Sequence, residues 1–301
     1  MEALQRTPRM HHEEYEEIPF SEDGTSKEGL AVSEEEYWEK YYENASEFIY
    51  EWNRGYLEVK PMGDMKAGRI YRWFNLILEC YLAANPVGTI VPYDIGFRLA
   101  LPTGVIVRIP DISLILNKNT DKIGDDDCTY NGIFDLCIES LSYSSLKYIV
   151  RDTVEKKREY QGIGVKEYYI LDARKKETAF YRLNKSGRYG KIRPVKGDII
   201  RSQELPGFQF RISDLYRQPL LGEMTDDGVY CGYVLPSYQE VKQRADQAQE
   251  QLISERQKTE QKTIETVRSM LSDNMLPDLI IKYTGLSADE ITAIRQTMDR
   301  K

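Results

Sequence analysis

Apolar and polar residues follow a helical spacing over residues 69–84, which predicts an amphipathic helix there. Ser33 is followed by three glutamates, which predicts the start of an earlier helix that runs to about Asn44. Between the two helices, residues 48–52 and 56–59 favour strands and flank an Asn-Arg-Gly turn, which predicts a hairpin. The apolar positions of the amphipathic helix are Ile70, Trp73, Phe74, Ile77, Leu78 and Tyr81.

Short apolar runs beyond this helix predict strands, and one further helix is predicted at about residues 146–161. The order helix, three strands, helix, strand indicates an α/β fold with a mixed sheet. The predicted strands cover residues 89–93, 95–101, 105–116, 133–142, 166–173 and 178–183, with more strands up to about residue 219.

The two ends of the chain differ from its middle. Residues 1–32 are acidic and poor in aliphatic side chains, which predicts a flexible leader before a domain at 33–220. Residues 238–272 lack glycine and proline and are rich in charged residues and glutamine, which is typical of a long polar helix or a short coiled coil. Residues 273–301 predict a small helical pair that resembles a helix-turn-helix, and such pairs serve packing or dimerisation more often than DNA recognition.

The composition of the chain excludes several classes of protein. No apolar run approaches the ~18 residues of a membrane span, and the N-terminus does not resemble a secretory signal, so we expect a cytoplasmic protein. The four cysteines share no metal-binding spacing. Both histidines lie in the leader, which disfavours histidine-based chemistry in the core.

Charge is distributed unevenly along the chain. The net charge is −8, yet residues 141–201 hold 16 lysines and arginines against 7 aspartates and glutamates. Phosphates respond to the local field, so this segment predicts a nucleic-acid surface. A solvated surface without a partner is the alternative. The basic side chains predicted to contact DNA are Lys147, Arg151, Lys157 and Arg158.

Two carboxylates interrupt apolar runs that predict strands. Asp111 follows Pro110 directly before one run, and Glu139 ends another. Carboxylates are costly to bury unless they are paired or bind a metal. If the two strands are neighbours, the carboxylates repel each other unless a proton or a cation lies between them, and Mg²⁺ prefers oxygen ligands. The alternative is that Asp111 lies in a turn and Glu139 at a strand end.

A lysine-rich helix follows the second carboxylate. Asp152, Lys156 and Tyr160 share one helical stripe. The apolar positions instead favour Lys157 near the middle of the inward face, with Lys156 at its rim. Either lysine could polarise a phosphate or assist an attacking water, or both could form surface ion pairs. The predicted inward positions are Ile149, Val150, Thr153, Val154 and Tyr160.

The residues that carry a family resemblance occur in order along the chain. They are Tyr50-Glu51 with Gly55 and Leu57, Arg108-Ile109-Pro110-Asp111, Glu139-Ser140-Leu141-Ser142, Asp152 with Lys156 and Tyr160, and residues 164–172. Over about residues 33–215 the chain resembles the PD-(D/E)XK restriction-endonuclease-like superfamily, and more narrowly its Uma family. Family members often carry a histidine after the first hairpin, and residues 60–75 contain none.

The resemblance implies a restriction-endonuclease-like core in which Asp111 and Glu139 bind Mg²⁺, with Mn²⁺ as a substitute. Lys156 would take the role of the superfamily lysine, because Leu141 stands where that lysine usually falls. Glu51 would correspond to a family glutamate near the site. The implied reaction is metal-dependent hydrolysis of a phosphodiester bond in DNA, in which the cation activates a water and Lys156 stabilises the transition state.

Two other functions remain open at the level of sequence. The chain could be a catalytically inactive DNA-binding or assembly module that uses its helical tail to dimerise or recruit a partner. It could also be a two-carboxylate carbohydrate hydrolase, which needs no metal. We expect a homodimer in the nuclease case, because cutting both strands needs two sites and the tail could join two chains.

Overall fold

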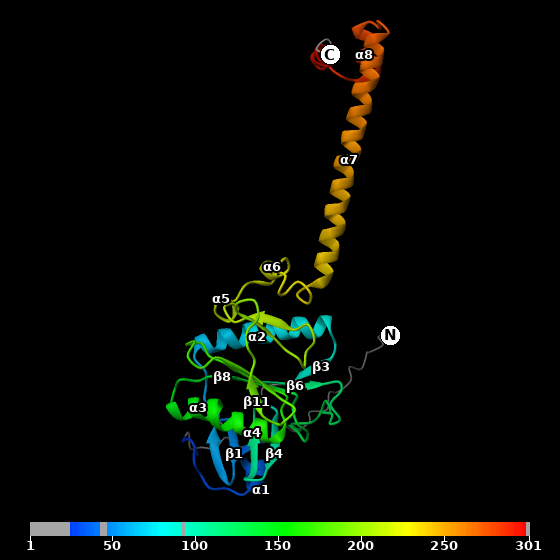
Figure 1. Cartoon of the computed structure of the whole chain (residues 1–301). Helices are drawn as coiled ribbons and strands as arrows, with labels where there is room; N and C mark the ends of the chain where they lie inside the picture. Colours follow the sequence, from blue (N-terminus) through cyan, green and yellow to red (C-terminus); the bar gives the residue numbers. More distant parts are fainter. Residues whose placement is uncertain (1–24, 43–46, 92–93, 299–301) are drawn as a thin grey trace, which may run out of the picture. The chain divides into compact units, whose positions relative to one another are not determined.

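A mixed six-stranded sheet lies at the centre of the first unit of the computed structural model, which describes residues 25–42, 47–91 and 94–298 (Figure 1). The strand order is β11-β10-β9-β8-β6-β3, and β8 and β9 are its parallel pair. The strands are β3 (Gly88–Val91), β6 (Ile112–Leu116), β8 (Leu136–Ser140), β9 (Glu167–Leu171), β10 (Ala179–Leu183) and β11 (Tyr189–Lys191).

A second sheet and a short third sheet complete this unit, which extends to Val234. The second sheet has the order β2-β1-β5-β4-β7. Its strands are β1 (Tyr50–Asn53), β2 (Tyr56–Val59), β4 (Gly96–Leu101), β5 (Gly104–Arg108) and β7 (Thr129–Tyr130), and the third sheet pairs β12 (Ile199–Arg201) with β13 (Gln209–Arg211).

Helices cover the six-stranded sheet on both faces. On one face lies α2, whose apolar side packs as its spacing predicts. On the other face, α3 and α4 are joined through the π-helical turn η2. The helices of this unit are α1 (Glu34–Tyr37) with the π-helical turn η1 (Trp38–Tyr42), α2 (Met65–Ala84), α3 (Leu146–Val150), η2 (Arg151–Glu155), α4 (Lys156–Ile163), α5 (Asp214–Arg217) and α6 (Leu221–Met224).

Two apolar clusters fill the space on the two sides of the six-stranded sheet. The first packs α2 against alternate sheet residues and against residues 199–234. The second packs the opposite sheet face against β4, β5 and Tyr160 of α4. Period-two alternation along β6 and β8 therefore sends neighbouring side chains into different clusters. The predicted α/β fold with a mixed sheet is confirmed.

The run at residues 105–116 is not the single strand that its apolar pattern predicts. It divides into β5 and β6, which belong to different sheets. Pro110 lies at the break, where its missing N–H would interrupt a ladder of hydrogen bonds. The chain thus crosses from one sheet to the other at Ile109–Asp111, and β6 begins at the next residue, Ile112.

The limits of the first unit also differ from those predicted. Residues 25–32 pack onto the hairpin, since the Val32 carbonyl accepts a hydrogen bond from Trp52 Nε1 at 3.0 Å and Gly29 N–H donates to Leu57 O at 2.8 Å. The prediction of a flexible leader is wrong for this part, and residues 1–24 lie outside the described residues. At the other end, Tyr230 and Val234 are buried in the core, beyond the predicted limit at residue 220.

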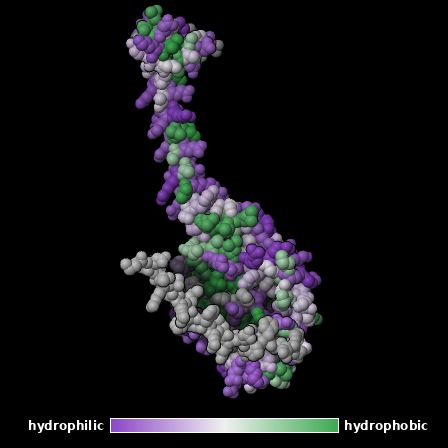
Figure 2. Space-filling model, turned by 180° about the vertical axis from the view of Figure 1, so that it is seen from behind, coloured by the Kyte–Doolittle hydropathy of each residue, from purple (hydrophilic) through white to green (hydrophobic). Residues whose placement is uncertain are grey.

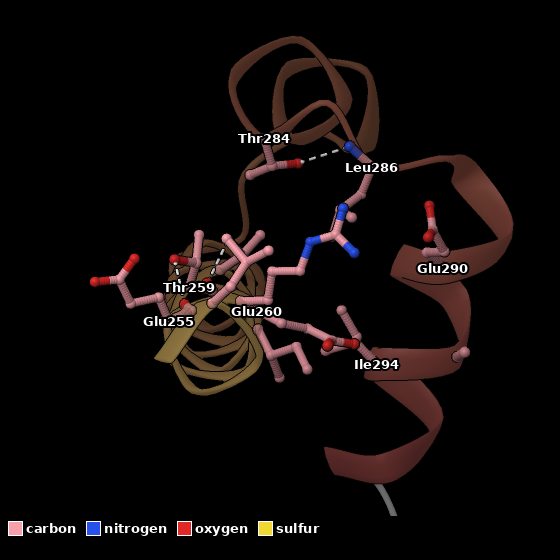
Figure 3. A pocket seen from close by; sticks show the side chains of 12 residues that line it. Glu255, Thr259, Glu260, Thr284, Leu286, Glu290 and Ile294 are labelled. Atoms are coloured by element: carbon pink, nitrogen blue, oxygen red, sulfur yellow. Dashed lines mark hydrogen bonds between the residues drawn. The ribbon is translucent and has the colours of Figure 1, made fainter. Parts of the chain in front are cut away.

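The second unit consists of α7 (Pro236–Ser272), α8 (Pro277–Thr284) and α9 (Ala288–Met298). Hydrophilic residues cover most of α7, with small hydrophobic patches between them (Figure 2). A cluster that includes Val267 and Ile280 joins the three helices. Arg256 and Glu260 of α7 and Ile294 of α9 line a cavity of about 760 Å³ in this unit (Figure 3).

No helix within the described residues combines the length and apolar character that crossing a bilayer requires.

Candidate active site

Asp111, directly before β6, lies opposite Glu139 of the neighbouring strand β8. The antiparallel register pairs Ile112 of β6 with Ile138 of β8, so the adjacent positions bring Asp111 opposite Glu139. Both isoleucines belong to the cluster on the α2 side, so the two carboxylates lie on the other face, toward α4. Asp111 Oδ2 accepts a hydrogen bond from Ser140 N–H at 2.7 Å. The predicted adjacency of the two strands is confirmed.

Lys156 connects the two sheets through its ammonium group. Its Nζ lies 2.9 Å from Oε1 of Glu139 on β8 and 3.0 Å from Oε1 of Glu51 on β1. The Tyr160 hydroxyl donates to the same Glu139 oxygen at 2.8 Å. All four side chains are buried. The structure therefore brings two of the predicted site carboxylates within ion-pair distance of the predicted site lysine.

The inward face of the helix that carries Lys156 is charged rather than apolar. Val150 and Val154, which the apolar pattern places inward, are 40 % and 37 % exposed. Lys157 lies outside the ion pairs of the site, with its Nζ 4.1 Å from the centre of the Tyr181 ring. The helical-wheel prediction is wrong here because the side that faces the core supplies ionic groups to the site. Motif spacing, which favours Lys156, identifies the lysine that reaches Glu139.

Asp152 is a further carboxylate of this site. It lies in η2, and π-helical turns inside helices occur frequently at functional sites. Its Oδ1 is 3.6 Å from Lys156 Nζ, and this buried oxygen has no hydrogen-bond partner among the described residues. A buried, under-bonded carboxylate oxygen is available to a ligand that enters the site.

Lys60, directly after β2, pairs with Asp111. Its Nζ lies 3.0 Å from Asp111 Oδ1 and donates to the Ile109 carbonyl oxygen at 2.9 Å. The Lys60 side chain is only 10 % exposed. Because Ser140 already holds the other oxygen of Asp111, Lys60 occupies the oxygen that would face an incoming cation.

Arg108 at the end of β5 fixes the position of Glu51. Its guanidinium is fully buried and donates to Glu51 Oε2 at 3.0 Å and to Glu58 Oε2 at 2.5 Å. It also forms two hydrogen bonds with Glu159 of α4, at 2.7 and 3.0 Å. Ile109 N–H donates to the remaining Glu51 oxygen at 3.0 Å. Such charge-assisted, multidentate contacts set both the position and the orientation of a carboxylate.

This network contains more carboxylates than cations. Its carboxylates are Glu51, Glu58, Asp111, Glu139, Asp152 and Glu159. Its cations are Lys60, Arg108, Arg151 and Lys156. Six negative and four positive groups leave two negative charges without a counterion inside the network. One divalent cation or two protons would balance them.

The pKa values of the site reflect this imbalance. Burial raises the pKa of Glu139 to about 8, with Asp111 and Asp152 adding to the rise and Lys156 opposing it. Burial likewise raises the pKa of Asp152. Burial alone would lower the pKa of Lys156, but Glu139, Glu51 and Asp152 together raise it above its ordinary value. Lys156 is therefore a permanent cation, and Glu139 and Asp152 are the neighbouring groups whose raised pKa values favour uptake of a proton, whereas burial of Glu51 is outweighed by Lys156 and Arg108, which lower its pKa.

A family model described as "Putative restriction endonuclease" (Uma2) matches residues 35–213. The chain belongs to this family. The match agrees with the boundaries of the resemblance found in the sequence, and it contains every residue of the network described above.

Comparison with curated proteins finds no match. Among solved structures, this Uma2 chain is similar to a crystal structure described as a putative nuclease belonging to DUF820 from Anabaena variabilis ATCC 29413. The two share 15 % sequence identity at a TM-score of 0.45, and the match covers 58 % of this chain and 93 % of the other.

The donor set of this Uma2 chain fits a divalent cation. Mg²⁺ usually binds through one or two carboxylates and retains several waters, and Asp111 and Glu139 supply the carboxylates. The under-bonded oxygen of Asp152 and the two excess negative charges fit the same ion. Within the described ranges, no three His, Cys, Asp or Glu side chains are grouped so that they could hold a metal ion together. Asp111 and Glu139 instead form ion pairs with Lys60 and Lys156.

The four side chains predicted to contact DNA do not form one surface. Lys147 is exposed and pairs with Glu28. Arg158 is exposed, whereas Lys157 packs against an aromatic ring. Arg151 is buried and donates to the Val59 carbonyl oxygen at 2.9 Å, so its assignment to an exposed DNA surface is wrong. Arg151 instead belongs to the network around Glu51.

The roles of several residues of this site cannot be predicted from the sequence. Lys60 and Glu159, and Arg108 of the Arg108–Asp111 motif, gain their roles from contacts between the hairpin, the strand crossover and α4, and these contacts join residues far apart in the chain. Asp152 is the exception, because it shares a helical stripe with Lys156. That spacing was the available signal for a third carboxylate.

Proposed function

We propose that this Uma2 protein is a Mg²⁺-dependent endonuclease that hydrolyses phosphodiester bonds of DNA. The observation that carries the proposal is the pairing of Asp111 opposite Glu139, with a buried ammonium group 2.9 Å from Glu139. Two carboxylates and a fixed cation on one sheet face are the groups that phosphodiester hydrolysis requires. Membership in a family described as "Putative restriction endonuclease" supports the same reaction.

In the proposed reaction, Asp111 and Glu139 would hold Mg²⁺, which when bound would lower the pKa of a water and neutralise charge on the scissile phosphate. The water oxygen releases a proton to solvent and forms a bond to phosphorus, and the bond from phosphorus to the leaving sugar oxygen breaks as that oxygen takes up a proton from solvent. Lys156, which stays protonated, stabilises the negative charge that develops on the phosphate oxygens. Glu51 and Glu139 hold its ammonium group in place.

Cleavage of supercoiled plasmid DNA tests the proposal. We expect nicking or linearisation by the wild type with Mg²⁺ or Mn²⁺, complete inhibition by EDTA, and loss of at least about 100-fold in rate for Asp111→Asn and Glu139→Gln. The matched control is Asp125→Asn, which removes a carboxylate from an exposed loop residue. Equal cutting by Asp111→Asn and the wild type would refute the assigned site.

A second candidate is DNA binding without cleavage. It is favoured by one observation: Asp111 and Glu139 each form an ion pair with a lysine of the chain itself, Lys60 and Lys156. A binding module would retain DNA after Asp111→Asn and would show no metal-dependent cutting in the wild type. The plasmid experiment therefore separates the two candidates.

We also propose that two chains associate through α7. Tyr238, Val241 and Leu252 are exposed, and with Ala245 and Ala248 they follow the alternating spacing of three and four residues that is typical of coiled coils. Light scattering of the full chain should give a dimer mass, and Val241→Glu with Leu252→Glu should give a monomer. A dimer mass that survives both substitutions would exclude this seam.

A further inference from the structure

A basic groove lies on the first unit beside the N-terminal half of α2. Two cavities of about 330 and 440 Å³ share Arg69 and Gln218 in their walls. Lys66 and Lys175 line the first cavity, and Arg72 lines the second. The cations therefore come from two separate parts of the chain, the first turns of α2 and the turn between β9 and β10, and they face one hollow.

The cations of this groove are only partly compensated by the protein. Neither Lys66 nor Arg69 forms an ion pair with another described residue, whereas Asp64 at the N-cap of α2 attracts Lys66 and Glu79 lines the cavity that contains Arg72. Lys175 lies over the ring of Tyr216, with its Nζ 4.4 Å from the ring centre. Like charges that share one hollow repel each other, and the dipole of α2 adds to this repulsion at its N-terminal end. A bound anion would relieve it.

Two chain segments connect the groove to the candidate active site. The first runs from Lys60, which pairs with Asp111, to Lys66. The six-residue step from Lys60 to Lys66 spans at most ~21 Å, which is less than the ~34 Å length of one turn of duplex DNA. The second follows β8, where Ser142 Oγ donates to the Met62 carbonyl oxygen at 3.0 Å. One nucleic-acid strand can therefore reach both places.

The second segment continues to the turn that carries Lys175. The Tyr143 hydroxyl donates to Asp172 Oδ2 at 2.9 Å, and the guanidinium of Arg174 lies 4.0 Å from the centre of the Tyr143 ring. Asp172 also accepts hydrogen bonds from the backbone N–H groups of Lys176 and Glu177 at 2.7 Å. These contacts fix the basic turn relative to the strand that carries Glu139.

We propose that this groove binds the phosphate backbone of a nucleic-acid strand beside the scissile phosphate, through Lys66, Arg69 and Lys175. The proposal rests on the proposed function and adds the path of the substrate. It also places the DNA-binding surface at this groove and not at Lys147 and Lys157, because Lys147 pairs with Glu28 and Lys157 packs on the Tyr181 ring. Backbone contacts of this kind carry no sequence information, so the groove holds DNA of any sequence.

Fluorescence anisotropy of a labelled duplex of about 20 base pairs, in EDTA and between about 50 and 200 mM salt, tests the groove separately from cleavage. The variant is Lys66→Gln with Arg69→Gln and Lys175→Gln in the full chain. Each lost phosphate contact lowers the slope of log K against log salt by ~0.9, so we expect a slope smaller by about 2–3 and at least about tenfold weaker binding at low salt.

The matched control removes three exposed cations near β11, at the edge of the six-stranded sheet: Lys185→Gln with Arg188→Gln and Lys191→Gln. We expect this variant to keep the wild-type slope. An equal loss in both variants, an unchanged slope in the groove variant, or no wild-type binding up to about 100 µM protein would overturn the proposal. So would a mononucleotide that binds the groove while the duplex does not.

The plasmid assay distinguishes failure of the groove from failure of the proposed function. If the wild type never cuts DNA but the groove variant loses binding, the nuclease proposal fails and the groove stands. If the wild type cuts DNA and the groove variant binds and cuts equally well, the groove proposal fails alone. Matching thermal unfolding of the variants and the wild type confirms that each variant is folded.

Discussion

Replacing Lys60 by methionine should strengthen the binding of a divalent cation in the absence of DNA. The Lys60 ammonium group and the cation compete for the same oxygen of Asp111, because Ser140 N–H holds the other oxygen at 2.7 Å. Methionine keeps most of the apolar volume of lysine but removes the charge. The substitution also leaves Asp111 near Glu139 without this counterion, which increases the negative potential at the site.

The size of the effect follows from the geometry of this pair. Two unit charges 3.0 Å apart interact by about 5 kcal/mol at an effective dielectric constant of about 20. The Asp111 carboxylate is part-exposed, and Lys60 can keep its contact with Ile109 O while a cation binds, so only part of this energy, on the order of 1–2 kcal/mol, opposes the cation. This corresponds to about tenfold tighter binding in Lys60→Met.

Electron paramagnetic resonance of free Mn²⁺ in titrations of the full-length protein measures this affinity without any cleavage. Lys60→Arg, which keeps the charge, serves as the control and should bind Mn²⁺ like the wild type. Lys118→Met, which removes a surface lysine paired with Glu204, should also leave the affinity unchanged. Equal or weaker Mn²⁺ binding by a folded Lys60→Met variant would refute the competition, and with it the role of Asp111 as a ligand.

Three further predictions concern stability. Lys156→Met leaves Glu51 and Glu139 without their shared cation and should lower the free energy of unfolding by about 3–5 kcal/mol. Lys157→Met removes only a contact with an aromatic ring and should lower it by about 1 kcal/mol. Urea denaturation measures both values, and equal losses would contradict the buried position of Lys156. Gly68→Ala should raise the free energy of unfolding by about 0.5–1 kcal/mol, because an added Cβ meets no atom within 4 Å and α2 gains a better helix former; a lower melting temperature would contradict this. Arg211 holds the pKa of Asp227 below its ordinary value of 3.8, so their ion pair stabilises the fold above that pH and is lost as the pH falls through the lowered pKa. The difference in melting temperature between the wild type and Asp227→Asn should therefore shrink in acid. A difference that stays constant with pH would contradict this stabilisation.

The sequence predicts the parts of the fold that depend on local pattern. The amphipathic helix α2, the hairpin and the strands β6 and β8 follow from spacing that each segment carries within itself. The two carboxylates are recognisable for the same reason, since each interrupts an apolar run where a charged group is costly. Their adjacency is a pairing between distant segments and becomes known only from the structure.

The apolar pattern fails to predict the site for one physical reason. An apolar pattern identifies an inward face only where that face packs against apolar groups, and the helix after β8 instead presents Asp152 and Lys156 to buried carboxylates and arginines. Lys60 shows the same effect, because its pairing with Asp111 depends on the hairpin reaching the crossover at Pro110. Buried ionic networks are therefore recognised from the contacts in the structure and not from the apolar pattern of the sequence.

The site can form only when β6 and β8 pair in the observed register. A slip of one residue between them would turn one carboxylate toward the apolar side of α2, since successive side chains point to opposite faces. The same slip would move Ile112 or Ile138 out of the core cluster, at a cost in buried apolar area. Correct core packing and assembly of the acidic pair are thus enforced together, so a misfolded sheet carries no intact site.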